Sequence, residues 1–518
     1  MKKRLMILEV SQKQAYIFAS KKLQENADRS EDISYVTGSR FFQAAAGELY
    51  SEEKNLVYAG GGHTVLQFDS QEQATEFARA VTEAAMRKFP GMELFVTQTD
   101  YDEAKTPGEN LKALSAALER KKSLRQASFR RLSFGVEKAG ETAEPPGRVS
   151  TGLRVPESWQ FPSQFEKLAG EDNFIAVVHV DGNETNNEQM SRLRHNFIAV
   201  VHVDGNGMGK RVERIYEKCG DWEDCRRTLR RFSEGIQRDF EQAFREMVET
   251  VIAARGCPVD QLPIRPVVLA GDDVCFVTAG NIGMECARVF MEKLSAMENC
   301  EQPGMPYAAC AGVALVHKKY PFHQAYDLAE ELCSSAKRFG AEIDSEGRVS
   351  AMDWHIEFSQ LKDSLSAIRE DYATEDGCRM ELRPVTVIVP DGVDPDRLEQ
   401  VTGGVRTYGF FKAMQKAMEG EYGKIARSKI KDLRTAVKQG RTATEFFLHD
   451  KQIRDLLYHS FSAKYRTTEQ KRAQYQKLAD GGSLEKAVFA EIDGVTRCLF
   501  FDAVEMIDHF KPLEEVEA

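Results

Sequence analysis

Short apolar runs alternate with helical patterns along the first 135 residues. Three runs rich in branched apolar residues have the length of buried strands, at 4–10, 55–68 and 92–98. Glycines divide the second run into a hairpin. Three segments whose apolar residues recur near every 3.6 positions predict helices, at 38–50, 71–89 and 109–122. The pattern therefore predicts one βαββαβα unit.

The same order recurs in the middle of the chain. Strand patterns lie at 197–204, 265–277 and 306–316, and helical patterns lie at 210–254, 282–297 and 321–338. Two βαββαβ units predict an α+β fold with two ferredoxin-like palm domains packed as a pseudo-dimer. A strand-like pattern lies at 385–390, and after about residue 395 only helical patterns follow. We expect a degenerate first palm, a linker, a catalytic second palm and an α-helical C-terminal domain, at 1–135, 136–172, 173–380 and 381–518.

The segment NFIAVVHVDGN occurs twice, at 173–183 and 196–206. The copies could compete for one strand position, because a palm needs only one such strand. We expect the second copy to form it, since only that copy continues into a glycine-rich turn and a long helix. His179 and His202 each stand two positions before an aspartate. We interpret them as packed or hydrogen-bonded histidines rather than as metal ligands.

Acidic residues mark the second hairpin, which reads AGDD at 270–273. Taken alone, Asp272 and Asp273 could form a solvated turn, because aspartate and glycine are common in turns. In a βαββαβ sheet, however, the first strand lies beside this hairpin, which brings Asp204 to the same edge. Three adjacent carboxylates need a compensating cation, and hard oxygen ligands select Mg²⁺ or Mn²⁺. The pattern predicts a two-ion site of the kind that supports attack on a phosphate.

Nucleotide-binding residues are predicted around these carboxylates. The turn GNGMGK (205–210) offers backbone N–H groups and a helix start that suit a phosphate, with a flexible turn as the alternative. A lysine near the end of the last palm helix could reach a triphosphate or simply lie at the surface. The predicted residues are Gly205, Asn206, Gly207, Gly209, Lys210, Gly271 and Lys337.

The first palm lacks the matching acidic hairpin. It carries Gly62 and His63 where the second palm carries Asp272 and Asp273, and its first strand ends in EVS (9–11) rather than VDG. We interpret this as a site without the carboxylates that a metal pair needs. The first palm is therefore expected to be catalytically silent and to shape one face of a composite nucleotide pocket.

Composition and charge limit the classes of partner. Apolar residues make up 42% of the chain and charged residues 29%, which is typical of a soluble globular protein. No apolar run approaches the roughly 18–20 residues of a membrane span, and no signal-peptide core is present. We therefore expect a cytoplasmic protein without a membrane partner. The net charge of −11 argues against a nucleic-acid footprint over the whole surface.

Two basic clusters nevertheless leave RNA open as a partner. The first comprises Arg120, Lys121, Lys122, Arg125, Arg130 and Arg131, and the second comprises Lys424, Arg427, Lys429, Lys431, Arg434, Lys438 and Arg441. Solvated helix faces explain the same pattern, so binding of RNA or another polyanion is the alternative interpretation.

These motifs together resemble the large palm subunit of type III CRISPR effector complexes. The resemblance rests on YIFASKKL, the YAGGGHTVL hairpin, VDGNGMGK, AGDD and HKKYPFHQAYDLAEELCSSAK, and it covers about residues 1–360. The second palm is more distantly similar to GGDEF diguanylate cyclases. The resemblance implies synthesis of cyclic oligoadenylates from ATP in antiviral defence. It also implies that Asp204 is the upstream metal ligand, that Asp272 and Asp273 belong to the family's GGDD hairpin, and that Lys337 is its helix lysine.

Two features of that family are missing from the sequence: an N-terminal HD nuclease domain and the zinc-binding cysteines between the palms. DNA cleavage is therefore not expected. A stand-alone cyclase stays open beside a subunit of an RNA-guided complex.

We expect a nucleotidyltransferase with two Mg²⁺ or Mn²⁺ ions that makes a cyclic nucleotide or short cyclic oligonucleotide from ATP. A non-catalytic RNA-binding scaffold subunit and a GTP-using dinucleotide cyclase are the alternatives. ATP or another nucleoside triphosphate is the expected substrate, while RNA, effector subunits and a second copy of the chain stay open as partners.

Overall fold

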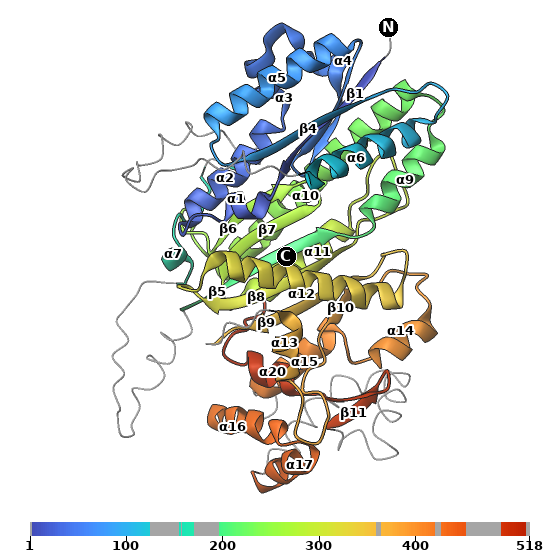
Figure 1. Cartoon of the computed structure of the whole chain (residues 1–518). Helices are drawn as coiled ribbons and strands as arrows, with labels where there is room; N and C mark the ends of the chain where they lie inside the picture. Colours follow the sequence, from blue (N-terminus) through green and yellow to red (C-terminus); the bar gives the residue numbers. More distant parts are fainter. Residues whose placement is uncertain are drawn as a thin grey trace.

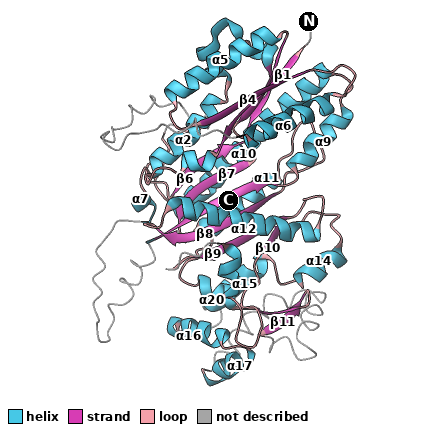
Figure 2. Cartoon of the chain, in the orientation of Figure 1, coloured by secondary structure: helices cyan, strands magenta, loops and turns pink. Residues whose placement is uncertain are grey.

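A computed structural model of the chain describes residues 3–124, 155–156, 158–169, 196–358, 364–419, 426–451 and 488–513. Figure 1 shows three regions in chain order: a blue sheet with its helices, a green and yellow sheet with its helices, and an orange and red region that ends the chain. Figure 2 shows that helices flank both large sheets.

The first palm contains a four-stranded antiparallel sheet in the order β2-β3-β1-β4. Its strands are β1 (Arg4–Ser11), β2 (Leu56–Gly60), β3 (His63–Phe68) and β4 (Glu93–Asp100). Its helices are α1 (Lys13–Ile17), α2 (Leu23–Val36), α3 (Ser39–Ala46), α4 (Glu52–Asn55), α5 (Gln71–Lys88) and α6 (Pro107–Ser123). The strands agree with the prediction. Helices α1 and α2 were not predicted, because polar residues interrupt their apolar spacing.

The second palm repeats this sheet and extends it, in the order β10-β9-β8-β5-β7-β6. Its strands are β5 (Phe197–Gly205), β6 (Ile264–Ala270), β7 (Asp273–Ala279), β8 (Ala309–His317), β9 (Ser350–Ile356) and β10 (Val385–Ile388). The part β8-β5-β7-β6 has the order of β4-β1-β3-β2 in the first palm. The predicted α+β fold with two ferredoxin-like palms is therefore confirmed.

Helices cover both faces of the second sheet: α9 (Met208–Lys218), α10 (Trp222–Arg255), α11 (Gly283–Ser295) and α12 (Phe322–Ile343). Strands β5 and β8 are buried along nearly their whole length, which explains why their sequences are continuously apolar. The helical region predicted at 210–254 is two helices, because Asp221 caps a new helix by accepting from the N–H of Asp224.

The second copy of the repeated segment forms β5, as expected. The first copy, 173–183, lies outside the described residues, as does His179.

Two strands lie outside the predicted palm pattern. Strand β9 pairs parallel with β8, and β10 pairs antiparallel with β9. The sheet of the second palm thus continues to Ile388, beyond position 381, where we expected the C-terminal domain to begin.

The C-terminal region is mostly helical: α13 (Leu365–Glu370), α14 (Pro395–Thr402), α15 (Tyr408–Glu419), α16 (Arg427–Lys438), α17 (Arg441–Asp450) and α20 (Phe501–Met506). The prediction of helices alone after residue 395 is wrong at one hairpin, β11 (Phe489–Ile492) and β12 (Val495–Cys498). Asp493 and Gly494 both have positive φ at its turn, and an Asp-Gly pair is a hairpin signal that the sequence contained.

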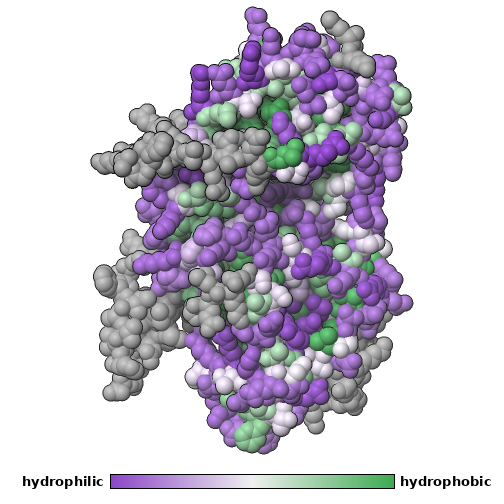
Figure 3. Space-filling model, viewed as in Figure 1, coloured by the Kyte–Doolittle hydropathy of each residue, from purple (hydrophilic) through white to green (hydrophobic). Residues whose placement is uncertain are grey.

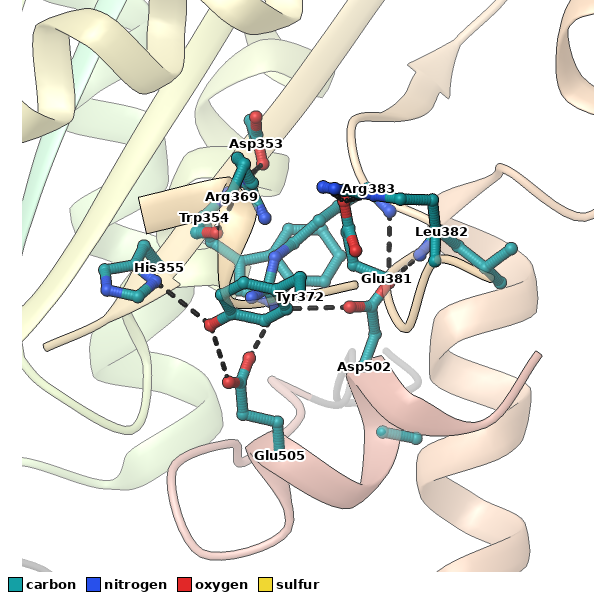
Figure 4. A network of polar contacts seen from close by, with 12 residues as sticks. Asp353, Trp354, His355, Arg369, Tyr372, Glu381, Leu382, Arg383, Asp502 and Glu505 are labelled. Carbon is teal, nitrogen blue, oxygen red and sulfur yellow. Dashed lines mark hydrogen bonds and ion pairs between the residues drawn. The ribbon is translucent and has the colours of Figure 1, made fainter. Parts of the chain in front are cut away.

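Buried charges connect α20 to the second palm (Figure 4). The guanidinium of Arg383 lies 2.6 Å from Glu505 and 3.2 Å from Asp502, and all three side chains are buried. Tyr372 donates to Glu505 at 2.8 Å and contacts His355 of β9 at 3.2 Å. The network thus joins the last helix of the chain to the extended edge of the sheet.

The two palms pack against each other at several points. Gly108 of α6 leaves space for Tyr216 of α9, since a Cβ there would lie 2.8 Å from the tyrosine. Phe18 packs on Tyr326 of α12 with ring centroids 4.3 Å apart. A Cβ on Gly271 would lie 3.7 Å from the amide nitrogen of Gly61, so the two hairpin tips face each other.

The face of the molecule seen in Figure 3 is mostly hydrophilic, with small hydrophobic patches between polar ones. None of the helices in the described ranges is long and apolar enough to span a bilayer.

Candidate active site

The predicted aspartates lie at one end of the second sheet. Asp204, near the end of β5, is the direct cross-strand partner of Asp273, the first residue of β7. Residues opposite each other in an antiparallel pair carry their side chains on the same face. The N–H of Gly205 donates to the carbonyl of Asp272 at 3.1 Å, which holds the hairpin tip against β5. The fold thus joins two stretches that are far apart in the sequence.

Glycines make this close approach feasible. A Cβ on Gly205 would lie 2.9 Å from the Cβ of Asp272, a contact that real side chains do not make. Gly271 has φ +69 at the hairpin tip, and its N–H donates to the side chain of Gln237 at 2.6 Å. Gly205 is therefore favoured because a side chain would collide with Asp272, and Gly271 is favoured by its positive φ.

Lys337 reaches this end of the sheet from α12. Its Nζ lies 2.6 Å from the carboxylate of Asp204 and donates to the carbonyl of Gly205 at 3.1 Å. Burial disfavours the ammonium ion, but the charge of Asp204 outweighs that effect and raises the pKa of Lys337. The lysine therefore brings a positive charge to the aspartates at neutral pH.

The carboxyl group of Asp272 has a raised pKa. Burial raises its pKa to about 6, and the negative charges of Asp204 and Asp273 add to that rise, while Lys337 opposes it. The three carboxylates are therefore close enough to repel one another.

The donor set fits a hard divalent cation. No group of three His, Cys, Asp or Glu side chains is poised to hold a metal ion among the described residues, and the ammonium of Lys337 contacts Asp204. Nevertheless Asp204 and Asp273 are opposite each other, and the carboxylate of Asp272 is destabilised by their charges. Such carboxylates are the ligands that Mg²⁺ and Mn²⁺ prefer, and a cation would relieve the repulsion.

The glycine-rich turn leads directly from Asp204 into α9. Gly207 is the N-cap residue of α9 with φ +67, and a Cβ on Gly209 would meet no atom within 4 Å. Asn206 is buried, and its amide donates to the carbonyl of Val349 at 2.9 Å. The turn therefore places the N-terminus of α9 next to Asp204, and helix N-termini favour anions.

Lys210 does not join this group. Its Nζ donates to the carbonyl of Ser345 at 2.7 Å and lies 3.5 Å from Glu346. The structure places it against the loop after α12 rather than beside the aspartates.

His202 contacts one of the three aspartates. Its Nε2 lies 3.0 Å from Oδ1 of Asp273, and the ring is buried. Burial disfavours protonation, but the hydrogen bond to Asp273 and the nearby acidic charges outweigh it and raise the pKa of His202. The histidine is hydrogen-bonded, as interpreted from the sequence, and its partner is one of the three aspartates.

The first palm has a carboxylate at the matching position of its first strand. Glu9 pairs with His63 across β1 and β3 as Asp204 pairs with Asp273, so the strand position carries a carboxylate although the hairpin of the first palm carries none. Lys122 of α6 lies 2.6 Å from Glu9. An acid–lysine pair therefore exists in both palms, although the acidic hairpin exists only in the second.

Many residues of the two basic clusters make contacts within the chain. Lys122 is paired with Glu9, Arg427 and Lys431 are paired with Asp508, and Lys438 donates to the carbonyl of Ala373. The ion pairs among these contacts neutralise part of the positive charge for which RNA was considered as a partner. Arg125, Arg130, Arg131 and Lys424 lie outside the described residues.

Two ferredoxin-like sheets, one of them with an acidic hairpin beside its first strand, define a tandem-palm protein. Residues 197–343 match the family model of Cas10/Cmr2, second palm domain. The resemblance to the large palm subunit of type III CRISPR complexes is therefore confirmed, and the chain contains a Cas10-like second palm. No curated protein matches the sequence.

Two solved structures are similar in fold over more than nine-tenths of the chain. A Csm1–Csm4 cassette in complex with cA3 is 13% identical with a TM-score of 0.53, covering 98% of this chain and 70% of that chain. Csm1 in T. onnurineus is 14% identical with a TM-score of 0.50, covering 91% and 67%. An apo Csm1–Csm4 cassette is 16% identical with a TM-score of 0.47, covering 70% of this chain and 55% of that chain, so the match spans little more than half of that relative.

Proposed function

We propose that the chain is a nucleotidyltransferase that makes cyclic oligoadenylates from ATP. One observation carries the proposal: Asp204 and Asp273 are opposite each other across β5 and β7, with Lys337 beside them, inside the segment that matches the Cas10/Cmr2 palm. Similar folds have been crystallised with cA3 and with pppApA, which supports an oligoadenylate product.

In the proposed reaction a ribose hydroxyl of one nucleotide attacks the α-phosphorus of another. The new O–P bond replaces the bond to the β-phosphate, pyrophosphate leaves, and the hydroxyl proton passes to solvent. Asp204, Asp272 and Asp273 would hold two Mg²⁺ or Mn²⁺ ions, which supply activation of the hydroxyl and neutralisation of the leaving group.

Lys337 is suited to bind the triphosphate. Its ammonium has three N–H donors, and the two contacts to Asp204 and Gly205 use two of them. The third can meet a phosphate oxygen without loss of the others. The N–H groups at the start of α9, after Gly207, face the same end of the sheet and would add backbone donors.

The first palm would present the acceptor nucleotide. Its hairpin tip at Gly61 faces Gly271 of the second palm, so a nucleotide at either tip lies near both. Lys13 donates to the carbonyl of Gly61 and fixes this tip. The composite pocket expected from the sequence is therefore part of the proposal.

Incubation of the chain with each nucleoside triphosphate and Mg²⁺ or Mn²⁺, followed by mass spectrometry of the products, tests the proposal. We expect cyclic adenylates and pyrophosphate, with at least about a 100-fold loss in the Asp272→Ala/Asp273→Ala variant. Asp260→Ala, at an exposed loop position, is the matched control and retains activity. Undiminished activity of the double variant would contradict the assignment.

A product made from GTP alone would favour the dinucleotide-cyclase alternative, because the metal site does not specify the base. Absence of product from every nucleotide, together with co-purified RNA and steep loss of RNA binding with salt, would favour the scaffold alternative.

A further inference from the structure

The buried side chain of His202 contacts the carboxylate of Asp273 from the interior of the protein. His202 lies two residues before Asp204 on β5, so both side chains project from the same face of the sheet. Its Nε2 is 3.0 Å from Oδ1 of Asp273, and its side chain is 6% exposed whereas that of Asp273 is 46% exposed. The ring therefore holds the inner side of a carboxylate whose outer side is open to solvent.

Side chains from both palms hold the ring in place. Tyr326 of α12 packs edge-on against His202 with centroids 5.4 Å apart, and Phe18 of the first palm packs on Tyr326. Four residues along α12, Glu330 accepts a hydrogen bond from Gln14 of α1 at 2.8 Å. The imidazole is thus fixed by packing across the boundary between the palms.

The corresponding position in the first palm is apolar. Glu9 aligns with Asp204 through the two sheet registers, so Ile7 occupies the place of His202. On the neighbouring strand β3, His63 stands opposite Glu9, where the second palm has Asp273 opposite Asp204. The first palm therefore lacks both the acidic hairpin and a hydrogen-bond donor at the position of His202.

We propose that His202 is a positioning residue: its Nε2–H fixes the carboxylate of Asp273 in the orientation that meets a divalent cation. The carboxylate can only accept, so Nε2 must carry the proton. The inference rests on the proposed function and adds to it the group that orients one of its ligands. Partners of metal ligands typically change metal affinity by about 10–100-fold when they are removed.

Two variants separate hydrogen bonding from packing. His202→Phe retains a ring against Tyr326 but has no donor, whereas His202→Gln retains an N–H donor that can reach Asp273. Mn²⁺ binding to the full chain, followed by electron paramagnetic resonance of the free ion, is measured beside thermal unfolding. The Asp204→Asn/Asp273→Asn variant supplies the background from ions bound elsewhere.

We expect His202→Phe to weaken Mn²⁺ binding by at least about 10-fold with a melting temperature near that of the wild type, and His202→Gln to restore it to within about 3-fold. If His202→Phe does not fold, His202→Asn, whose amide is too short to reach Asp273, replaces it. If His202→Phe binds Mn²⁺ as tightly as the wild type, or if His202→Gln binds it as weakly as His202→Phe, the positioning role is overturned and the proposed function is not. Wild-type protein that binds no more Mn²⁺ than the background variant overturns the proposed function and the positioning role with it.

Discussion

The two palms have the same strand order and the same acid–lysine pair but different hairpins. Lys122 contacts Glu9 in the first palm as Lys337 contacts Asp204 in the second, at 2.6 Å in each case. The hairpin of the first palm offers His63, and burial together with the charge of Lys13 lowers the pKa of that histidine to about 4. A neutral histidine does not attract a cation as a carboxylate does. The comparison teaches that the acid–lysine pair at the end of the first strand is common to both palms, whereas the acidic hairpin is not.

The second palm also differs in its extended edge, which Arg383 joins to α20 (Figure 4). Arg383→Met leaves the buried carboxylates of Glu505 and Asp502 without their cation, and breaking such a pair costs about 3–5 kcal/mol. Urea unfolding should show this loss. Arg231→Met, which removes a 3.7 Å pair between the exposed Arg231 and Glu301, is the control and should cost at most about 1 kcal/mol. If both variants lost the same small free energy of unfolding, the Arg383 network would not be what holds α20 against the second palm.

The carboxylate at the end of the first strand should be needed for activity in the second palm (Asp204) but not in the first (Glu9). Asp204→Asn removes a predicted cation ligand and should reduce pyrophosphate release by at least about 100-fold. Glu9→Gln removes the equivalent carboxylate of the first palm and should reduce it by less than about 5-fold. A loss from Glu9→Gln as large as that from Asp204→Asn would mean that both palms are catalytic.

The two lysines give a smaller contrast. Lys337→Met should raise the KM for ATP by about 10-fold, because a charge-assisted contact to phosphate is lost. Lys122→Met should change KM by less than about 2-fold. Steady-state kinetics at saturating Mg²⁺ measure both, and a reversed order of the two effects would place the triphosphate in the first palm.

The smallest effect concerns Asp272. Its pKa of about 6 lies above the ordinary aspartate value, so the folded state holds its proton more tightly than the unfolded chain does. Folded stability without divalent cations therefore falls as pH rises from about 4 through 6. Asp272→Asn should raise the melting temperature at pH 8 by about 2–4 °C and leave it unchanged below pH 4. A variant that melts lower than the wild type at pH 8 without cations would refute the predicted repulsion.

The sequence predicted β5 and β8 well because these strands are apolar on both faces, whereas it missed β9. Strand β5 and the hairpin of β6 and β7 lie where the pattern placed them, and Ser70 caps α5 as such a residue should. The short helix α1 and the four-residue strands β11 and β12 escaped prediction because so few residues give no clear period.

The site could be predicted only as far as topology dictates it. The sheet order brings Asp204 to Asp273 in any βαββαβ unit, so that proximity followed from the pattern. The contact of Lys210 with Ser345 depends on the loop after α12, which spacing does not encode. Spacing placed His202 on the same face of β5 as Asp204, but its hydrogen bond to Asp273 depends on the side-chain rotamers of both residues. The equivalence of Glu9 to Asp204 was not inferred because the segment EVS does not repeat the VDG motif, although the register of Glu9 in β1 is the same.

The most direct test of the difference between the palms is crystallographic. Crystals of the chain with MnCl₂ and a non-hydrolysable ATP analogue, measured at the manganese absorption edge, would locate the ions by their anomalous signal. We expect peaks between Asp204 and Asp273 of the second palm and none at Glu9 and His63. Manganese beside Glu9, or its absence from the second hairpin while the nucleotide is bound, would contradict this assignment.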